Sequence, residues 1–318
     1  MATKTLSAAE KDPFCTRDVI KNQVCHVGEH FTVIYNKKVL TDGHSLIITK
    51  RHAQGLLDLT AAEVRELFGT INQVLPAILE VYNNGERAYD IKIRSGEYSG
   101  RTVDHFHVHL IPRKRIPDGN GGTERERIYE KNLQNPDRPV LEDFKSDLTR
   151  IRRGMDELGP VVVRAASGPG AVHVELDARL LDNVFYESRH FVALYHPAPV
   201  IEGKALLVPK RDISDFLELS REEQRDFSRT YAKVMNMLLK AYGDESRSYI
   251  TSMQIGGYEA MPLNRLHIHL IPRSKSDRYA GRDDDMYYDI YEGKGGAPVM
   301  TESEIRKEVE SLRRLARE

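Results

Sequence analysis

The sequence is short of the features that mark several classes of protein. Its 318 residues include no tryptophan and only two cysteines, Cys15 and Cys25, with no Cys-x-x-Cys spacing. This argues against a disulfide framework and against a thiolate zinc site. No apolar run approaches the roughly 18 residues of a transmembrane helix, and Met1 to Phe14 lacks the basic and apolar segments of a secretory signal. We therefore expect a cytoplasmic protein with no membrane partner.

An excess of either charge is also absent. Lysine and arginine total 47 against 48 for aspartate and glutamate, a formal net charge of −1. No global positive field is available to hold nucleic acid, so we expect no nucleic-acid partner and only local recognition of phosphate. The composition, 40% hydrophobic and 30% charged, is that of a globular protein. At about 150 residues per domain, the length predicts two domains.

An internal repeat confirms that expectation within the sequence itself. A shift of 160 positions aligns residues 24–113 with 184–273 without a gap, and 26 of these 90 positions are identical. Such similarity indicates two copies of one domain. We predict a first domain over residues 1–158, a linker over 159–175 that contains the Ser167-Gly168-Pro169-Gly170 stretch, and a second domain over 176–318.

Both copies show the same predicted series of elements. Strand patterns lie near residues 31–35, 45–49, 88–93 and 105–111, and again near 191–195, 205–209, 248–253 and 266–271. Thr60 with Glu63 and Ser220 with Glu223 form capping boxes, each of which begins a long amphipathic helix, and Thr301 with Glu304 forms a third at the start of the last helix. Closing helices are expected over 141–158 and 301–317. The fold class is therefore α+β, with an antiparallel sheet and one long helix across it in each copy.

Histidines alternate along one strand of the first copy. His105, His107 and His109 fall on one side of that strand, while Phe106 and Val108 and their neighbours point into the core. Alternating histidines are typical of a partly exposed strand face, of a metal site or of a catalytic row. Three in register, with a pair at the same place in the second copy, favour the catalytic interpretation.

At these residues the sequence resembles the histidine triad family. The pattern His-x-His-x-His followed by two apolar residues is its motif, and the surrounding segments resemble the fragile histidine triad branch, the dinucleoside polyphosphate hydrolases. Asn36, the Gly43-His44 pair and Ile128-Tyr129-Glu130 match further motifs of that branch, and Ile290-Tyr291-Glu292 repeats the last of them. The resemblance implies two tandem domains that form an intrachain pseudo-dimer with a continuous sheet of about ten strands.

The resemblance also implies roles for single residues. His107 becomes the nucleophile that attacks the α-phosphorus of a nucleotide, with His109 as a donor to a phosphate oxygen and His105 joined to His44 in a supporting network. The implied substrate contacts are Asn36, Arg94, Ser95, Arg101, Thr102 and Tyr129. Arg94 and Arg101 stand where the branch usually has glutamine, and we expect them to bind an additional phosphate or the leaving group. No tightly bound cofactor or metal is implied, although Mg²⁺ is expected to accompany the polyphosphate.

The second copy departs further from the family pattern. It keeps His267 and His269, and Gln254 matches a family glutamine, so these three residues form a second candidate nucleotide site. Arg265 replaces the first histidine and Lys204 replaces the histidine after the glycine. A cation beside an imidazole disfavours imidazole protonation, and we expect a weak or inactive second site.

The residues leave three functions open. The first is hydrolysis of dinucleoside polyphosphates through a covalent nucleotidyl-histidine, in a chain that needs no partner subunit. The second is a nucleotidyltransferase or phosphorylase, because the same intermediate can pass to a sugar phosphate or to phosphate instead of water. The third is a nucleotide-binding signalling module, against which the complete first triad weighs.

Overall fold

The structure is a computed structural model that describes residues 12–15, 21–37, 39–113, 145–158, 178–256, 265–282 and 300–317. It divides into two compact units. The first consists of residues 1–93 and 102–161, and the second of residues 94–101 and 162–318. The predicted linker over 159–175 lies outside the described residues, and the predicted domain boundaries stay predictions. No helix in the described ranges is long and apolar enough to cross a membrane.

The strands are antiparallel and confirm the α+β class. Their order is β1-β2-β3-β5-β4 in the first unit and β9-β10-β8-β7-β6 in the second. In the first unit they are β1 (Val24–Val27), β2 (Phe31–Tyr35), β3 (Ser45–Thr49), β4 (Tyr89–Ser95), whose last two residues group with the second unit, and β5 (His107–Pro112). In the second they are β6 (Val184–Glu187), β7 (Phe191–Tyr195), β8 (Ala205–Pro209), β9 (Ser248–Ile255) and β10 (Ile268–Arg273).

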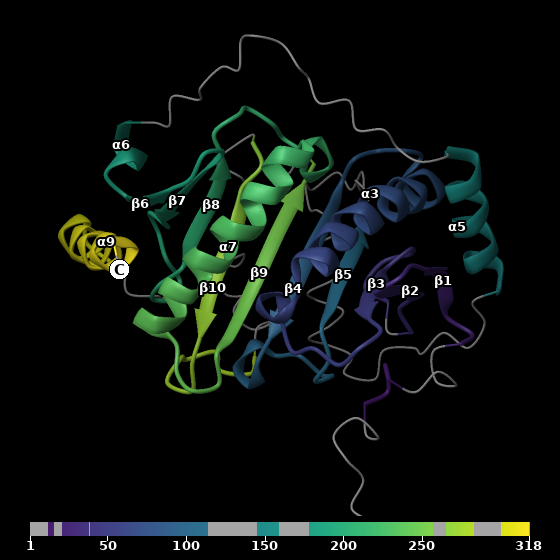
Figure 1. Cartoon of the computed structure of the whole chain (residues 1–318), viewed down its shortest axis with the longest axis horizontal. Coiled ribbons are helices and arrows are strands. Elements are labelled where there is room, and N and C mark those ends of the chain that lie inside the picture. The colour runs from purple at the N-terminus through teal and green to yellow at the C-terminus, as the bar shows by residue number, and fades with distance from the viewer. Residues whose placement is uncertain are drawn as a thin grey trace, which may run out of the picture. The chain divides into compact units, whose positions relative to one another are not determined.

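One long helix lies across the strands of each unit (Figure 1): α3 (Ala61–Asn83) in the first and α7 (Arg221–Tyr242) in the second. α5 (Lys145–Leu158) packs against α3 and β1, and α9 (Glu302–Arg317) packs against α7 and β6. Short helical turns complete the series: η1 (Leu56–Asp58), η2 (Glu97–Ser99), α6 (Ala178–Leu181) and η3 (Phe216–Glu218). All three predicted capping boxes form, at Thr60, Ser220 and Thr301. They begin α3, α7 and α9 at the predicted positions.

The sequence analysis missed β1 and β6. Each has four residues with a mixed burial pattern, too short for a clear alternation signal. The structure places them at the two ends of the strand order, paired with β2 and β7. Their pairing with a longer neighbour, which tertiary structure supplies, defines them as strands.

A glycine in each copy allows the turn before the third strand of the unit. Gly43 and Gly203 have φ of +82° and +79°, in the left-handed region that favours glycine. A Cβ at Gly43 would lie 2.5 Å from Tyr82, and one at Gly203 would lie 2.4 Å from Tyr242. The repeated Gly and Tyr are therefore a packing pair that sets the entry into β3 and β8, where His44 and Lys204 follow.

The same ion pair joins the strand turn to the long helix in both units. Arg51 Nε and Nη2 donate to the two Glu63 carboxylate oxygens at 2.6 and 2.8 Å, and Arg211 binds Glu223 in the same way at 2.9 and 2.8 Å. The Arg51 hydrogen bonds, with those from Thr60, lower the pKa of Glu63 to about 2. Glu63 thus connects the turn after β3 to the first turn of α3.

We predict that Glu63→Gln lowers the free energy of unfolding near pH 7 by about 1–2 kcal/mol, because glutamine keeps the cap but loses the charge-assisted bonds. Since the carboxylate has its lowered pKa only in the folded state, its contribution is present above pH 4.5 and is lost as the pH falls toward 2. Chemical denaturation from pH 7 to pH 2 measures it. Glu80→Gln, on the exposed side of α3, is the control, and equal pH profiles for both variants would contradict the prediction.

Candidate active site

The predicted histidine row lies at the start of β5. His107 and His109 belong to this strand, and His105 lies two residues before its first residue. Phe106, Val108 and Leu110 are completely buried, which confirms that they point into the core. β5 pairs with β3 so that His107 lies opposite Ile48 and His109 lies opposite Leu46. The register determines which groups of β3 and its flanking turns can reach each imidazole.

His107 is oriented by its own backbone. Its Nδ1 donates to the carbonyl oxygen of His105 at 2.6 Å, so the proton of the neutral ring is on Nδ1. Nε2 then carries the lone pair. The imidazole is 4% exposed and its ring centroid lies 4.9 Å from that of His109. This is the tautomer that a nitrogen nucleophile needs at Nε2.

A chain of hydrogen bonds assigns the tautomer of His109 as well. The backbone N–H of Leu40 donates to His44 Nδ1 at 3.1 Å, so His44 carries its proton on Nε2. His44 Nε2 lies 3.0 Å from His109 Nδ1 and donates to it. His109 therefore carries its proton on Nε2, as a donor. Asn36 Nδ2 lies 3.3 Å from the His44 ring nitrogens and adds to this network.

The expected link between His44 and His105 is wrong. In the antiparallel pairing, His44 at the beginning of β3 lies toward the His109 end of β5, whereas Thr49 at the end of β3 lies toward His105. The supporting histidine consequently acts on His109. The residues of the network could be predicted from the sequence. The register between β3 and β5, which determines which histidine His44 contacts, could not.

His105 is held by two acceptors. Its Nδ1 lies 2.6 Å from Asp12 Oδ2, and its Nε2 lies 2.7 Å from the carbonyl oxygen of Thr49. Asp12 therefore accepts from Nδ1, while Nε2 also lies 2.9 Å from the Thr49 hydroxyl oxygen. Burial raises the pKa of Asp12, but hydrogen bonds from His105, Phe14, His52 and Cys15 outweigh it and lower that pKa to about 2.

The segment Asp12–Cys15 was not predicted as part of the site. Phe14 contacts the edges of two imidazoles, with ring centroids 5.7 Å from His105 and 5.5 Å from His107. It therefore supplies an apolar contact to the row beside the Asp12 carboxylate. Four residues outside any helix or strand carried no periodicity, so only the donor residues in Asp-Pro-Phe-Cys could have drawn attention to them.

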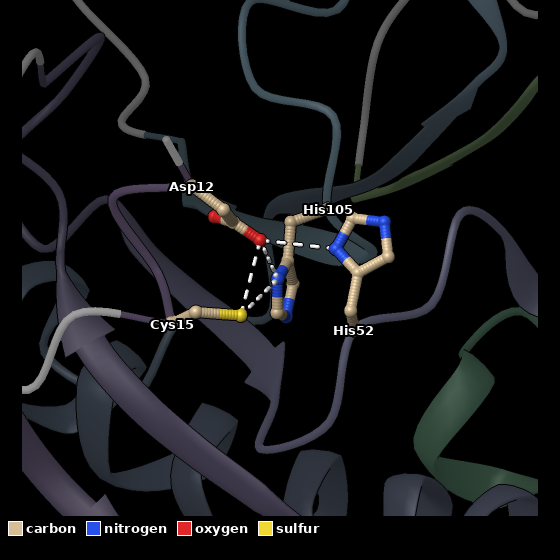
Figure 2. Close-up of side chains that lie close together, drawn as sticks. All are labelled: Asp12, Cys15, His52 and His105. Carbon is tan, nitrogen blue, oxygen red and sulfur yellow. Dashed lines mark hydrogen bonds and ion pairs between the residues drawn. The ribbon is translucent and has the colours of Figure 1, made fainter. Parts of the chain in front are cut away.

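Asp12, Cys15, His52 and His105 could also hold a metal ion (Figure 2). Asp12 Oδ2 lies 3.1 Å from His52 Nδ1 and 3.2 Å from Cys15 Sγ, and one donor atom from each residue lies within 4.8 Å of the other three. Carboxylate, thiolate and imidazole suit Zn²⁺, which would take the place of the His105 Nδ1 proton. Burial, and then Asp12, raise the pKa of Cys15 to about 11, so the metal-free thiol is not a nucleophile. A missing Cys-x-x-Cys spacing does not bear on a site with one cysteine among mixed donors; the expectation of no bound metal stays a prediction.

The other predicted contacts have different outcomes. Arg94, Ser95 and Arg101 group with the second compact unit, where the Arg94 side chain donates to the carbonyl of Gly100. Thr102 is exposed in the first unit. Tyr129 and the repeated Ile290-Tyr291-Glu292 lie outside the described residues. Lys92, which sequence reasoning did not select, is buried on β4 opposite His109.

The second unit repeats the central geometry. His267 Nδ1 lies 2.8 Å from the carbonyl oxygen of Arg265, and the ring centroids of His267 and His269 are 5.1 Å apart. Gln254 follows Met253, which pairs with Ile268, so it continues the strand opposite His267. The three residues of the second candidate site are thus neighbours in one unit.

The chain is similar in sequence to two curated proteins over part of its length. Over 128 residues the chain is 33% identical to a bis(5'-nucleosyl)-tetraphosphatase (asymmetrical) of Schizosaccharomyces pombe, which covers 39% of this chain and 67% of that protein. Over 130 residues it is 28% identical to the nitrilase and fragile histidine triad fusion protein NitFhit of Drosophila melanogaster. That match covers 41% of this chain but only 28% of the fusion protein.

A solved structure of a uridylyltransferase resembles the whole fold, with a TM-score of 0.55 at 16% identity over 92% of this chain and 86% of that one. At this identity the likeness concerns the fold alone. The HIT domain family matches residues 17–116 and 179–276, which together cover more than half of the sequence and contain both histidine rows. The chain therefore belongs to the HIT domain family, with two copies of the domain.

Proposed function

We propose that the first unit hydrolyses dinucleoside polyphosphates through a nucleotidyl-histidine. The observation that carries this proposal is the pair of tautomers: His107 presents an Nε2 lone pair beside a His109 that presents an Nε2 proton. The S. pombe relative, named as a dinucleoside tetraphosphatase, supports the substrate class. A nucleophile next to a fixed donor is the arrangement that phosphoryl transfer requires.

In the first step, His107 Nε2 attacks the α-phosphorus and forms a nitrogen–phosphorus bond. The bond from that phosphorus to the bridging oxygen breaks, and the remaining nucleotide leaves with the electron pair. Nδ1 keeps its proton, so the phosphorylated ring is cationic and its hydrogen bond to the His105 carbonyl strengthens. In the second step, water attacks the same phosphorus, the nitrogen–phosphorus bond breaks, and the neutral imidazole returns while the water proton passes to solvent.

The neighbouring residues stabilise charge on phosphorus. The Nε2 proton of His109, held by the Leu40–His44 chain, donates to a non-bridging oxygen as charge accumulates on the phosphoryl group. The His105–Asp12 pair acts on His107 indirectly, because the carbonyl oxygen that accepts from His107 Nδ1 belongs to His105. Asp12 is thus a positioning residue, which acts through His105.

The substrate contacts remain part of the proposal. Asn36 would bind a ribose, and Ser95 and Thr102 would bind phosphate oxygens. Tyr129 would contact the bound substrate. Arg94 and Arg101 would neutralise an additional phosphate, and Mg²⁺ would accompany the polyphosphate chain. Each guanidinium forms strong bonds with phosphate where the phosphate lies within reach.

A transferase or phosphorylase is the second candidate, because the fold resemblance to a uridylyltransferase fits the same covalent intermediate. Diadenosine triphosphate in ¹⁸O-water separates the two. A hydrolase gives AMP with one ¹⁸O and ADP, in amounts that do not depend on added phosphate. Unlabelled ADP from the adenylyl half, formed only with added phosphate, would establish a phosphorylase instead. Tight nucleotide binding with negligible turnover under both conditions would favour the signalling module.

We expect His107→Asn to lower kcat by at least about 10³-fold while nucleotide binding stays measurable, because the covalent route is lost and the other contacts remain. Quench-flow with radiolabelled substrate should show labelled protein for the native chain and none for the variant. His30→Asn, at a turn of the same unit, is the control. Full activity of His107→Asn, with activity lost in His267→Asn, would place the reaction in the second unit.

Asp12→Asn should lower kcat by about 10–100-fold with little change in KM, because asparagine keeps an acceptor beside His105 but removes the charge that holds it. The KM-against-kcat split distinguishes positioning from loss of the binding site. Asp42→Asn, on an exposed turn, is the control. Metal analysis of both purified variants shows whether the four-residue cluster also holds Zn²⁺. A kcat equal to that of the control would refute the positioning role of Asp12.

A further inference from the structure

The segment of residues 94–101 belongs to the first copy in the sequence but groups with the second unit in the structure. It carries Arg94 and Arg101, two of the predicted substrate contacts. It also continues directly from the part of β4 whose Ile93 pairs with Val108 on β5. Contacts that hold this segment therefore hold the backbone at both arginines, and the structure shows these contacts within the second unit.

Short-range hydrogen bonds close the segment on itself. The Ser99 hydroxyl donates to the Gly96 carbonyl oxygen at 2.8 Å, and Arg94 Nη1 donates to the Gly100 carbonyl oxygen at 3.3 Å. Gly96 and Gly100 have φ of +81° and +73°, in the left-handed region that favours glycine. The segment is therefore a compact turn, and a contact to one of its residues restrains the others.

Ser248, the first residue of β9, holds this turn from outside it. Its side-chain oxygen accepts from the Tyr98 N–H at 3.0 Å, and Ser248 is completely buried. The Gly281 N–H donates to the Tyr98 carbonyl oxygen at 3.1 Å, so both backbone groups of Tyr98 are bonded. A Cβ at Gly96 would lie 2.5 Å from Ser248 Cα, so the turn lies directly against the beginning of β9.

The Ser248 hydroxyl belongs to a chain of hydrogen bonds that ends on a carboxylate. Ser246 Oγ donates to Asp244 Oδ1, so the proton between the two serine oxygens, which are 2.8 Å apart, comes from Ser248. Burial raises the pKa of Asp244, but hydrogen bonds from Ser246 and from the Lys275 N–H outweigh it and lower that pKa. The charged carboxylate polarises the chain and makes Ser248 a stronger acceptor for Tyr98.

The first copy lacks this chain of side chains. Other residues occupy the three repeat positions: Asn84, Glu86 and Ala88 stand where the second copy has Asp244, Ser246 and Ser248. The Gly–Tyr turn and the Arg–Glu ion pair, in contrast, are the same in both copies. The hydroxyl that holds residues 94–101 is therefore specific to the second copy, because alanine at its repeat position has no hydroxyl.

We propose that Ser248 is a positioning residue, through which the second copy holds residues 94–101 in the conformation that binds the longer phosphate chain. The inference rests on the proposed function, in which Arg94 and Arg101 neutralise an additional phosphate. A segment that is held before the substrate arrives loses less conformational entropy on binding, and a larger fraction of the protein is competent to bind. The longer substrate uses both guanidinium groups, so Ser248 acts on the preference between substrates.

Ser248→Ala tests the inference in the full chain, and Ala88 shows that alanine fits this position of the repeat. We expect the KM for diadenosine tetraphosphate to rise about threefold to tenfold, as for the loss of one hydrogen bond, with kcat within about twofold. The KM for the triphosphate should change less. Hydrogen–deuterium exchange should be faster in the peptide that contains Tyr98. Faster exchange with an unchanged ratio of the two KM values would show a structural role only and overturn the inference.

Thr251→Val is the matched control on the same strand. It removes the hydrogen bond between the Thr251 and Tyr231 hydroxyls, which are 2.7 Å apart, and leaves residues 94–101 unchanged. Each variant loses one buried hydrogen bond, so the two should lower the melting temperature by similar amounts. The control should change neither the exchange at Tyr98 nor the ratio of KM values. An equal shift of that ratio in both variants would attribute it to lost stability and overturn the inference.

Affinities measured in the His107→Asn background separate this inference from the proposed function, because no substrate is consumed there. Titration calorimetry should show that Ser248→Ala weakens binding of the tetraphosphate more than that of the triphosphate. A native chain that binds both dinucleotides but hydrolyses neither would refute the proposed function, and the affinity ratio would still decide the role of Ser248. Equal affinity ratios with and without Ser248→Ala would overturn the inference in either case.

Discussion

The hydrogen bond from His107 Nδ1 to the carbonyl oxygen of His105 orients the central imidazole, and the proposed chemistry depends on it. It is made within three consecutive residues at the entry to β5, so it needs no partner from elsewhere in the fold. The sheet nevertheless makes it possible, because the extended backbone brings the carbonyl of residue i within reach of the ring of residue i+2. The same bond recurs between His267 and Arg265. A duplicated strand has thus kept the orientation of its central imidazole, although the residue that contributes the carbonyl has changed from histidine to arginine.

The two units show which parts of the arrangement can be exchanged. The carbonyls of Thr49 and Pro209 both contact the side chain at the same repeat position, the imidazole of His105 in one unit and the guanidinium of Arg265 in the other. His105 binds Asp12, whereas Asp212 acts on the Arg265 guanidinium through space. Burial, and then the charges of Lys204 and Arg265, lower the pKa of His267. The histidine row of the first unit therefore includes a histidine–aspartate pair, while the central imidazole of the second unit is under the influence of two cations.

The sequence predicted most of the framework because the signals were local. The capping boxes at Thr60, Ser220 and Thr301 fixed the helix starts, and the alternation of His105 to Leu110 gave the faces of β5. Alignment of the sequence with itself at a shift of 160 positions predicted two copies of one domain. Membership of the histidine row followed from alternation alone, since residues two apart share a face.

Two features of the site, the Asp12 contact and the partner of His44, could not be predicted from the sequence because they depend on long-range contacts. Asp12 lies 93 residues from His105 in the chain, and no periodic pattern links them. The partner of His44 depended on the register between β3 and β5, which places it beside His109, although its presence in the network was foreseen. Register is decided by the packing of whole strands, so a motif can name the members of a site and still assign them to the wrong neighbours.

The two copies share contacts in the framework but differ in side chains at the site, and this difference has a physical reason. The Arg51–Glu63 and Arg211–Glu223 pairs use matching atoms, because each joins a turn to a helix cap and any change of length would break both. His44 and Lys204 occupy equivalent places after a constrained Gly–Tyr turn, and there the backbone is fixed while the side chain faces the site. A rigid turn that presents one side chain allows that side chain to change without disturbing the sheet. The duplicated fold can therefore present a buried histidine at this position in one unit and a buried lysine in the other on the same backbone.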